Sequence, residues 1–347
     1  MRSDKNPQKG KSEMRQYATL LLVIFVVSSQ MISCTGPKLQ KYFTSKKDVI
    51  FFSPGDHYNA DDIRSYEEIA SELGLTTKEV SYGFINQRGS FFDDYGRRKF
   101  QVLIIPGGEE NWWFEKKPTG QRGPGINCQG VNNILDFVKS GGSIIALCHC
   151  APSLFSKMKE WRSPGLKFSQ QGMWNVKHYH QGWFRQICGV YAFEGTVSGP
   201  LESNAPYPKA RFLPIKLNPE NEIVQKGNLP PVIYMLVTGA GPIIPDEGQP
   251  LDVVGWFPNG TAAIGIVPYG PGSIIMCGPH PNITGKRSEI FREKFMCGDY
   301  ARGIGFTEKM IQDNRKIIET NPDPDGPSPD WALAKAMLSY AYKKASN

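Results

Sequence analysis

The residues of this sequence best suited to chemistry stand at the ends of three apolar segments. Cys148 ends the run SIIALC, His280 ends the run GSIIMCGPH, and Gly107 and Gly108 end the run FQVLIIPGG. A thiol and an imidazole are the nucleophile and the base of cysteine-dependent acyl transfer, and glycine N–H groups can bind an oxyanion because no side chain obstructs them. If the three segments are neighbouring strands, the sequence predicts an acyl-transfer site where they end.

The segments around these residues alternate between strand and helix patterns. Continuous apolar runs bounded by turn residues predict buried strands, and apolar residues at helical spacing that end in glycine predict helices. The predicted strands are 47–55, 78–85, 100–108, 143–148, 232–241, 251–257, 261–270 and 272–280, and the predicted helices are 61–74, 131–142 and one from about residue 151. This alternation predicts an α/β fold: a mostly parallel sheet with helices on both faces, a strand-rich second half and a C-terminal helical extension.

The position of Cys148 has three interpretations. As a nucleophile elbow it would occupy a strained turn between a strand and a helix, with Ala146 and Cys150 as the small flanking residues where glycine is usual. As a structural thiol it would pack in the core like a small apolar residue. As part of a soft-metal or redox site it would act with Cys150 and His280, but the sequence has no C-x₂-C pair. We favour the nucleophile and expect no metal.

The N-terminus predicts export and lipid attachment. Residues 1–33 carry a basic segment, the apolar run ATLLLVIFVV of signal-peptide length, and a short polar stretch before Cys34. The sequence MISC at this point resembles a bacterial lipobox, in which cleavage before the cysteine leaves it lipid-modified. We therefore predict a lipoprotein signal peptide over 1–33, a linker over 34–46, and an extracytoplasmic protein anchored to the membrane through Cys34 on the periplasmic or cell-surface side. The alternative is an uncleaved anchor, because residues 17–32 are almost continuously apolar.

Charge and motifs argue against nucleic acid and against a nucleotide cofactor. The 347 residues carry a formal net charge of +7, of which residues 1–33 contribute +3. So small a surplus, with no basic stripe interleaved with aromatic residues, is not typical of a nucleic-acid-binding protein. The sequence also has no Gly-x-x-x-x-Gly-Lys-Ser/Thr and no Gly-x-Gly-x-x-Gly motif, so we predict a protein without a cofactor.

The cysteines matter because an exported protein matures under oxidising conditions. Cys148 and Cys150 are separated by one residue, which rarely permits normal disulfide geometry. We therefore predict that Cys148 is a free thiol and that Cys150 is a small buried residue. Structural disulfides, if any, would use the other four cysteines beyond Cys34, which are Cys128, Cys188, Cys277 and Cys297.

Several segments, in their order along the chain, resemble one protein family. They are YNADDIRSYEEIASEL, VLIIPGGEE, ILDFVKSGGSIIALCHCA, FEGTVSGP, TGAGP and VVGWFPNGTAAIGIVPYGPGSIIMCGPHPN. This order is similar to the class I glutamine amidotransferase-like fold, and in particular to the family named for the N-terminal domain of biotin–protein ligases. The resemblance spans about residues 47–285 and leaves 286–347 as the helical extension, which is too short for the catalytic domain of a biotin ligase.

The resemblance implies a role for the residues at the strand ends. Cys148 would be the nucleophile and His280 the general base, with the N–H groups of Gly108 and His149 as the oxyanion hole. Asn282 occupies the place at which amidotransferases carry the glutamate that orients the histidine. An amide can accept an N–H from the imidazole, but it stabilises the imidazolium less than a carboxylate does.

Substrate-binding residues are expected at and after the two glycines. The candidates are Gly107, Glu109, Trp112 and Trp113, with the tryptophans as walls of a pocket. The predicted function is that of an amidotransferase-like cysteine hydrolase that acts on a small-molecule or peptide amide or ester. The alternative is a non-catalytic module that binds a small molecule or a protein, an interpretation that the departures at Asn282 and Cys150 favour.

Overall fold

The computed structural model of the chain describes residues 48–53, 60–107, 125–148, 157–160, 190–194, 211–237, 240–245, 247–258, 260–282, 308–309, 311–312, 315–316 and 328–346. All of these belong to one compact unit, Lys47–Asn347. The predicted signal peptide and the predicted linker lie outside the described residues, as do residues 151–156, where a helix is expected to begin; residues 157–160 form a strand. Within the described ranges, every helix is too short or too polar to serve as a membrane span.

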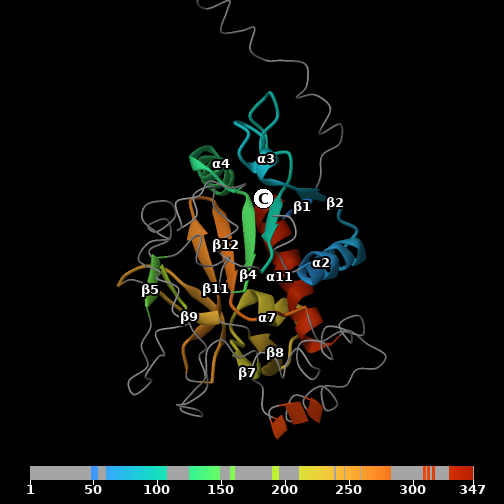
Figure 1. Cartoon of the computed structure of the whole chain (residues 1–347), viewed down its shortest axis with the longest axis vertical. Coiled ribbons are helices and arrows are strands. Elements are labelled where there is room, and N and C mark those ends of the chain that lie inside the picture. Colours follow the sequence, from blue (N-terminus) through green and yellow to red (C-terminus); the bar gives the residue numbers. More distant parts are fainter. Residues whose placement is uncertain are drawn as a thin grey trace, which may run out of the picture. The chain divides into compact units, whose positions relative to one another are not determined.

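The first half of the sheet is parallel. Its strands are β2 (Thr77–Val80), β1 (Val49–Phe52), β3 (Val102–Ile105), β4 (Ser143–Leu147) and β12 (Gly272–Cys277), in that spatial order (Figure 1). The four strands β1, β3, β4 and β12 are buried along their whole length. Strands that are covered on both faces need apolar residues at every position, which is why these segments are recognisable in the sequence.

The second half of the sheet is antiparallel. From β12 it continues through β11 (Ala262–Tyr269), β10 (Asp252–Trp256), β7 (Arg211–Leu217) and β8 (Val232–Val237). A branch from β11 contains the remaining described strands, which are β9 (Ala240–Pro245), β6 (Val190–Glu194) and β5 (Lys157–Glu160). The sheet is therefore mixed, and the expectation of a mostly parallel sheet is correct only for its first half.

The segments 261–270 and 272–280 are predicted from the sequence as a turn-linked hairpin, which the structure confirms, whereas β7 and the division of 232–241 are not predicted. Tyr269 pairs with Gly272, so only two residues join β11 to β12, and Gly270 has the positive φ of 61° that such a tight hairpin turn uses. The sequence does not predict β7, because Pro214 lies inside it and proline is unusual in paired strands. The segment 232–241 is two strands, β8 and β9, where the sequence predicts one.

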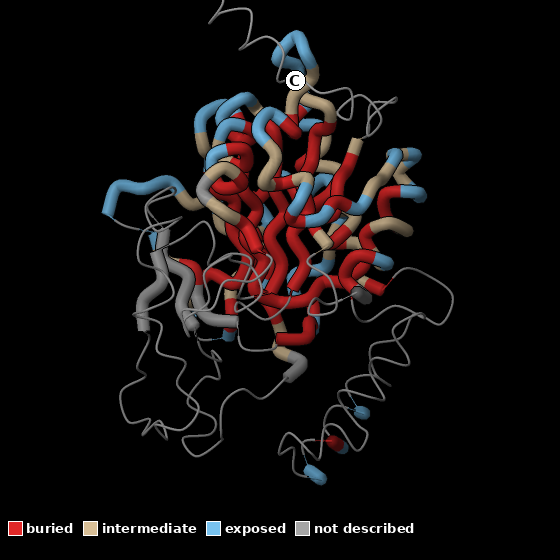
Figure 2. Tube along the Cα trace, turned by 45° about the horizontal axis from the view of Figure 1, so that its top comes forward, coloured by how far each residue is buried: buried red, intermediate tan, exposed pale blue. Residues whose placement is uncertain are grey.

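Helices cover both faces of the sheet, as expected. Side chains alternate along the strands, so Val102 and Ile104 of β3 join one core cluster while Leu103 and Ile105 join another. The first cluster includes residues of α2 (Ala60–Glu72), α7 (Glu222–Gly227) and α11 (Pro329–Ser346), and the second includes residues of α3 (Tyr82–Ile85) and α4 (Cys128–Lys139). Figure 2 shows the buried residues gathered along the strands between these helices.

Helix α11 lies within the predicted extension 286–347, yet it packs into the same core as the sheet. Trp331, Leu333 and Met337 are buried in the first cluster, so the helix covers one face of the core. Polar contacts hold it as well: Lys335 Nζ lies 2.8 Å from Glu72 Oε2 at the end of α2. The last part of the chain therefore contributes to the stability of the sheet that carries the site.

A buried polar pair sets the register of the two strands most important for the site. Ser143 pairs with Ser273 at the start of β4 and β12, and their hydroxyl oxygens are 3.0 Å apart. Both side chains are buried, and each satisfies the other's hydrogen-bonding group where no water is available. The ladder continues in the same register to Leu147 and Cys277, so the two strands end at the same level.

Candidate active site

Three parallel strands end at one edge of the sheet, and the candidate residues follow them there. Ile105 of β3 pairs with Ala146 of β4, and Leu147 of β4 pairs with Cys277 of β12. Gly107 and Cys148 therefore leave the sheet side by side, with the turn that leads to His280 next to them. The expectation that these strand ends meet is confirmed.

Cys148 sits on a sharp turn directly after β4. Its φ is +60°, in the left-handed region that residues with a Cβ rarely adopt. This backbone turns the side chain away from the alternation of β4 and costs roughly 1–2 kcal/mol for a residue other than glycine. Cys148 is a thiol rather than half of a disulfide, as predicted, and it is 6% exposed. Its backbone has the strain expected of a nucleophile elbow.

The strained backbone can be tested with two substitutions at one position. We expect Cys148→Gly to have a free energy of unfolding about 1 kcal/mol higher than that of Cys148→Ala, because only glycine tolerates φ of +60° without strain. Urea denaturation of the two variants measures the difference. Ala146→Gly, two residues earlier in β4, is the control and should lower stability; an alanine variant at 148 as stable as the glycine variant would contradict the strained turn.

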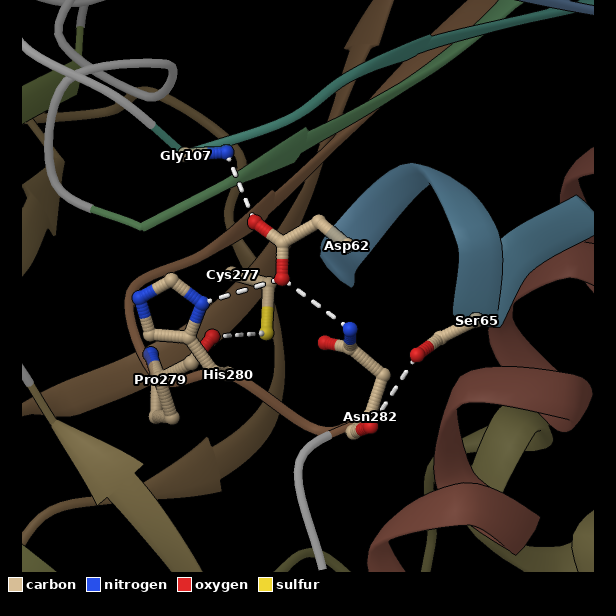
Figure 3. Close-up of polar contacts among 7 residues, drawn as sticks. All are labelled: Asp62, Ser65, Gly107, Cys277, Pro279, His280 and Asn282. Carbon is tan, nitrogen blue, oxygen red and sulfur yellow. Dashed lines mark hydrogen bonds and ion pairs between the residues drawn. The ribbon is translucent and has the colours of Figure 1, made fainter. Parts of the chain in front are cut away.

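His280 is held from its backbone and from its ring. Its N–H donates to the carbonyl of Leu236 in β8 over 2.8 Å, and its side chain is buried, at 3% exposure. The ring nitrogen Nδ1 lies 3.2 Å from Oδ1 of Asp62, which comes from the first turn of α2 (Figure 3). The imidazole therefore has a defined position and a carboxylate partner.

Asp62 is the hub of the polar contacts in Figure 3. It is fully buried, and its Oδ1 also accepts a hydrogen bond of 3.0 Å from Nδ2 of Asn282. Its Oδ2 accepts a hydrogen bond of 2.9 Å from the N–H of Gly107. A buried carboxylate is costly unless it is paired and hydrogen-bonded. The contacts of Asp62 with His280, Asn282 and Gly107 supply that pairing.

Gly107 is the point at which the three side chains converge. A Cβ placed on Gly107 would lie 2.8 Å from Cys148 Cβ, 3.0 Å from His280 Cε1 and 3.1 Å from Asp62 Oδ2. These separations are too short for any side chain at position 107. Glycine is therefore required here because the thiol, the imidazole and the carboxylate all pack against this backbone.

The charges around His280 favour its protonated form. Burial alone lowers the pKa of His280, but the carboxylate of Asp62 and the charge of Cys148, with hydrogen bonds to both side chains, raise that pKa well above 6.5. For the Cys277 thiol, a raised pKa favours the neutral form rather than the charged one. Burial, followed by the charges of Asp62 and Cys148, raises the pKa of Cys277, so it stays neutral. Its Sγ donates to the carbonyl of Pro279 over 3.3 Å.

Two expectations need correction. Asn282 does not take the place of the orienting glutamate: its Nδ2 donates to Asp62, and the partner of the imidazole is the Asp62 carboxylate. The N–H of Gly107 was expected to face a substrate, and it donates to Asp62. The physical reason is the same in both cases, because a buried carboxylate gathers the nearest donors.

The local sequence does not mark Asp62 as a member of the site. Its segment DDIRSYEEI indicates the start of a helix, where an aspartate is usual. A further signal is present, however. Asp62 lies four residues before Tyr66 and seven before Ile69, which are both fully buried, so it belongs to the apolar face of α2. A carboxylate at a core-facing helical position needs a partner, and that need could have identified it.

The other predicted site residues fall outside the described part of the chain. They are Cys34, Gly108, Glu109, Trp112, Trp113, His149 and Cys150. Cys277, one of the four cysteines considered for disulfides, is a free thiol in the part of the chain that the structure describes. Among the described residues there is no cluster of three or more histidine, cysteine or acidic side chains that could hold a metal ion.

No family model matches this chain, and no curated protein matches it either. Among solved structures, a glutamine amidotransferase from Methylobacillus flagellatus is 8% identical over 86% of this chain and 95% of its own, with a TM-score of 0.44. The protein SMU.1228c is 13% identical over 84% of this chain and 99% of its own, with a TM-score of 0.43. A β-galactosidase from Bacillus circulans sp. alkalophilus is 13% identical over 68% of this chain, with a TM-score of 0.40, and this chain spans only 29% of its length. These are distant likenesses of fold, and the chain itself is a mixed α/β protein with a C-terminal helix packed on its sheet.

Proposed function

We propose that this protein is a cysteine hydrolase of the class I glutamine amidotransferase-like type, with Cys148 as nucleophile and His280 as general acid and base. The substrate would be a small-molecule or peptide amide or ester. The order of sequence motifs from YNADDIRSY to GPHPN supports a place in the family named for the biotin–protein ligase N-terminal domain. The predicted lipid anchor at Cys34 would place the activity outside the cytoplasm.

One observation carries the proposal. Cys148 has the strained, left-handed backbone of a nucleophile elbow, and it packs against Gly107 together with His280. Structural thiols have no need of such a backbone, because a cysteine in an ordinary strand conformation would fill the same space. Strain of this kind is typical of residues whose position serves chemistry.

The proposed reaction has two steps. The Cys148 thiolate attacks the carbonyl carbon, and the imidazolium of His280 gives its proton to the departing amine or alcohol, which leaves a thioester on Cys148. His280 then takes a proton from water, the resulting hydroxide attacks the thioester, and the carboxylic acid leaves as the Cys148 thiolate and the His280 imidazolium are restored. The predicted oxyanion donors, the N–H groups of Gly108 and His149, would stabilise the negative oxygen in both steps.

The competing hypothesis of a non-catalytic binding module loses one of its two arguments. It was motivated by Asn282, which leaves the amidotransferase position without a carboxylate. The contact of Asp62 with His280 supplies a carboxylate from another part of the chain. We therefore favour the enzyme.

The pH dependence of thiol alkylation tests this proposal without knowledge of the substrate. The full chain is treated with iodoacetamide between pH 5 and 9.5, and modification of Cys148 is followed by peptide mass spectrometry. An imidazolium beside a thiol favours the thiolate at low pH. We therefore expect the rate at pH 6, relative to the plateau, to exceed the same ratio for free cysteine by about tenfold or more. Relative rates are used because burial slows the reagent equally at every pH.

Two variants complete this experiment. His280→Gln removes the imidazole, and the ratio should fall to that of free cysteine. Cys277→Ser changes a second buried thiol of the described residues and should leave the Cys148 profile as it is. If wild-type Cys148 follows the profile of free cysteine, it is not an activated nucleophile, and the proposed function is wrong.

A further inference from the structure

We infer that Asp62, in the first turn of α2, is the positioning residue for His280, and that Asn282 acts on Asp62 rather than on the histidine. This inference rests on the proposed function and adds to it the origin of the orienting carboxylate. The carboxylate comes from a residue 218 positions before His280, on a helix that packs against the strands of the site.

The contact with Asp62 decides which ring nitrogen does the chemistry. Nδ1 of His280 lies 3.2 Å from Asp62 Oδ1, so in the neutral ring Nδ1 carries the proton and donates it to the carboxylate. That leaves Nε2 as the basic nitrogen for the interaction with Cys148. A carboxylate that holds a histidine in this tautomer is the third member of a nucleophile–base–acid arrangement.

The surroundings of Asp62 hold it in place more firmly than one contact could. The Gly107 N–H fixes Oδ2 and the Asn282 amide shares Oδ1 with the imidazole. Ser65, almost one turn along α2, donates to the carbonyl of Asn282 over 3.3 Å (Figure 3). Helix α2 is thus held to the segment that carries His280 through both Asp62 and Ser65, and these contacts fix the distance between carboxylate and imidazole.

The charge of Asp62 acts on several buried groups that surround it. These groups are His280, Cys277 and Tyr66, and Cys148 also acts on His280 and on Cys277. Burial raises the pKa values of Tyr66 and Cys277, so both stay neutral. The Tyr66 hydroxyl has no hydrogen-bond partner among the described residues and Cys277 donates to Pro279, so neither binds the carboxylate in place of the imidazole. The charge of Asp62 therefore stabilises the imidazolium of His280, and this imidazolium in turn favours the thiolate of Cys148.

The first test needs no variant. In the full chain with ¹⁵N-labelled histidine, the ring-nitrogen shifts of His280, assigned with His280→Gln, report protonation and tautomer across pH. We expect a protonated ring well above pH 6.5, and above its titration the tautomer with the proton on Nδ1. A neutral ring with its proton on Nε2 would overturn the inference, and it would do so whatever the reactivity of Cys148.

The second test compares Asp62→Asn with Tyr66→Phe. Asparagine keeps the shape and removes the charge, so burial then dominates and the pKa of His280 should fall. Alkylation of Cys148 at pH 6 should fall by about tenfold or more, because the thiolate loses its imidazolium partner. Tyr66→Phe is matched, because Tyr66 is equally buried one turn along α2 and its hydroxyl has no hydrogen-bond partner among the described residues; both titrations should stay as in the wild type.

The outcomes separate this inference from the proposed function. If wild-type Cys148 is activated and Asp62→Asn leaves both profiles unchanged, Asp62 is a structural residue only and the inference is wrong. If wild-type Cys148 reacts like free cysteine, the proposed function is wrong, and the tautomer of His280 still tests the role of Asp62. Should Asp62→Asn not fold, Asp62→Glu keeps the charge and should preserve a protonated His280 above pH 6.5; loss of that protonation would overturn the inference.

Discussion

Leu333→Ala and Met337→Ala in α11 are each expected to lower the free energy of unfolding by about 2–5 kcal/mol. Both side chains are fully buried in the core cluster that also contains residues of β1, β3, β4 and α2. Truncation would remove their contacts and leave cavities that a closely packed core cannot fill. Urea denaturation of each full-length variant, followed by circular dichroism, measures the loss.

The control for this prediction lies on the same helix. Lys343 is exposed near the end of α11, and Lys343→Ala should change the free energy of unfolding by less than about 0.5 kcal/mol. If the buried and the exposed substitutions had equal effects, α11 would not belong to the core. Loss of these core side chains should also disturb the site, since α11 packs against β4 and β12, the strands that lead to Cys148 and His280.

Gly107→Ala is expected to damage stability and the site together. The new Cβ would lie 2.8 Å from Cys148 Cβ and 3.0 Å from His280 Cε1, so both side chains must move. Overpacking of this kind costs about 1–3 kcal/mol. The displaced imidazole would no longer face Cys148 at the same distance, and the alkylation of Cys148 at pH 6 should fall to the level of free cysteine. Denaturation and the alkylation profile measure the two effects.

A second glycine provides the matched control for Gly107. Gly83 lies in α3, and a Cβ there would meet its nearest neighbour, Ser81 Oγ, at the ordinary distance of 3.6 Å. Neither glycine has a positive φ, so neither substitution is strained by the backbone conformation, and only the one at Gly107 meets close neighbours. We expect Gly83→Ala to leave the alkylation profile intact. An equally intact profile in Gly107→Ala would show that the close approach at position 107 has no bearing on the site.

The parallel half of the fold and two members of the site are visible in the sequence because they depend on local patterns. Runs such as VLII and SIIAL are apolar at every position, and this is the pattern of strands covered on both faces. Cys148 and His280 follow such runs, and parallel strands end at the same edge, so the pattern of the sequence is enough to predict that the two residues lie close together. The strain at Cys148 is likewise a property of the turn that follows the strand.

The antiparallel half depends on pairings that these patterns do not specify. Strand patterns alone predict a mostly parallel sheet, because they do not show which strands are neighbours. The hairpin turn at Gly270-Pro271 is visible in the sequence, but the pairings of β10 with β7 and of β7 with β8 are not, and β7 contains a proline that tertiary pairing tolerates. Strand order is decided by the packing of whole faces, which is the sum of many contacts between residues far apart in sequence.

The carboxylate that orients His280 is the clearest case of a feature that local sequence does not predict and tertiary packing decides. The amino-acid pattern is sufficient to predict that a thiol and an imidazole end neighbouring strands, and it offers Asn282, two residues after His280, as the candidate partner. The role falls to Asp62 instead, because α2 packs on the sheet with its first turn against Gly107 and His280. The physical reason is that the imidazole binds whichever acceptor lies within hydrogen-bond distance, and that distance results from helix packing rather than from separation along the chain.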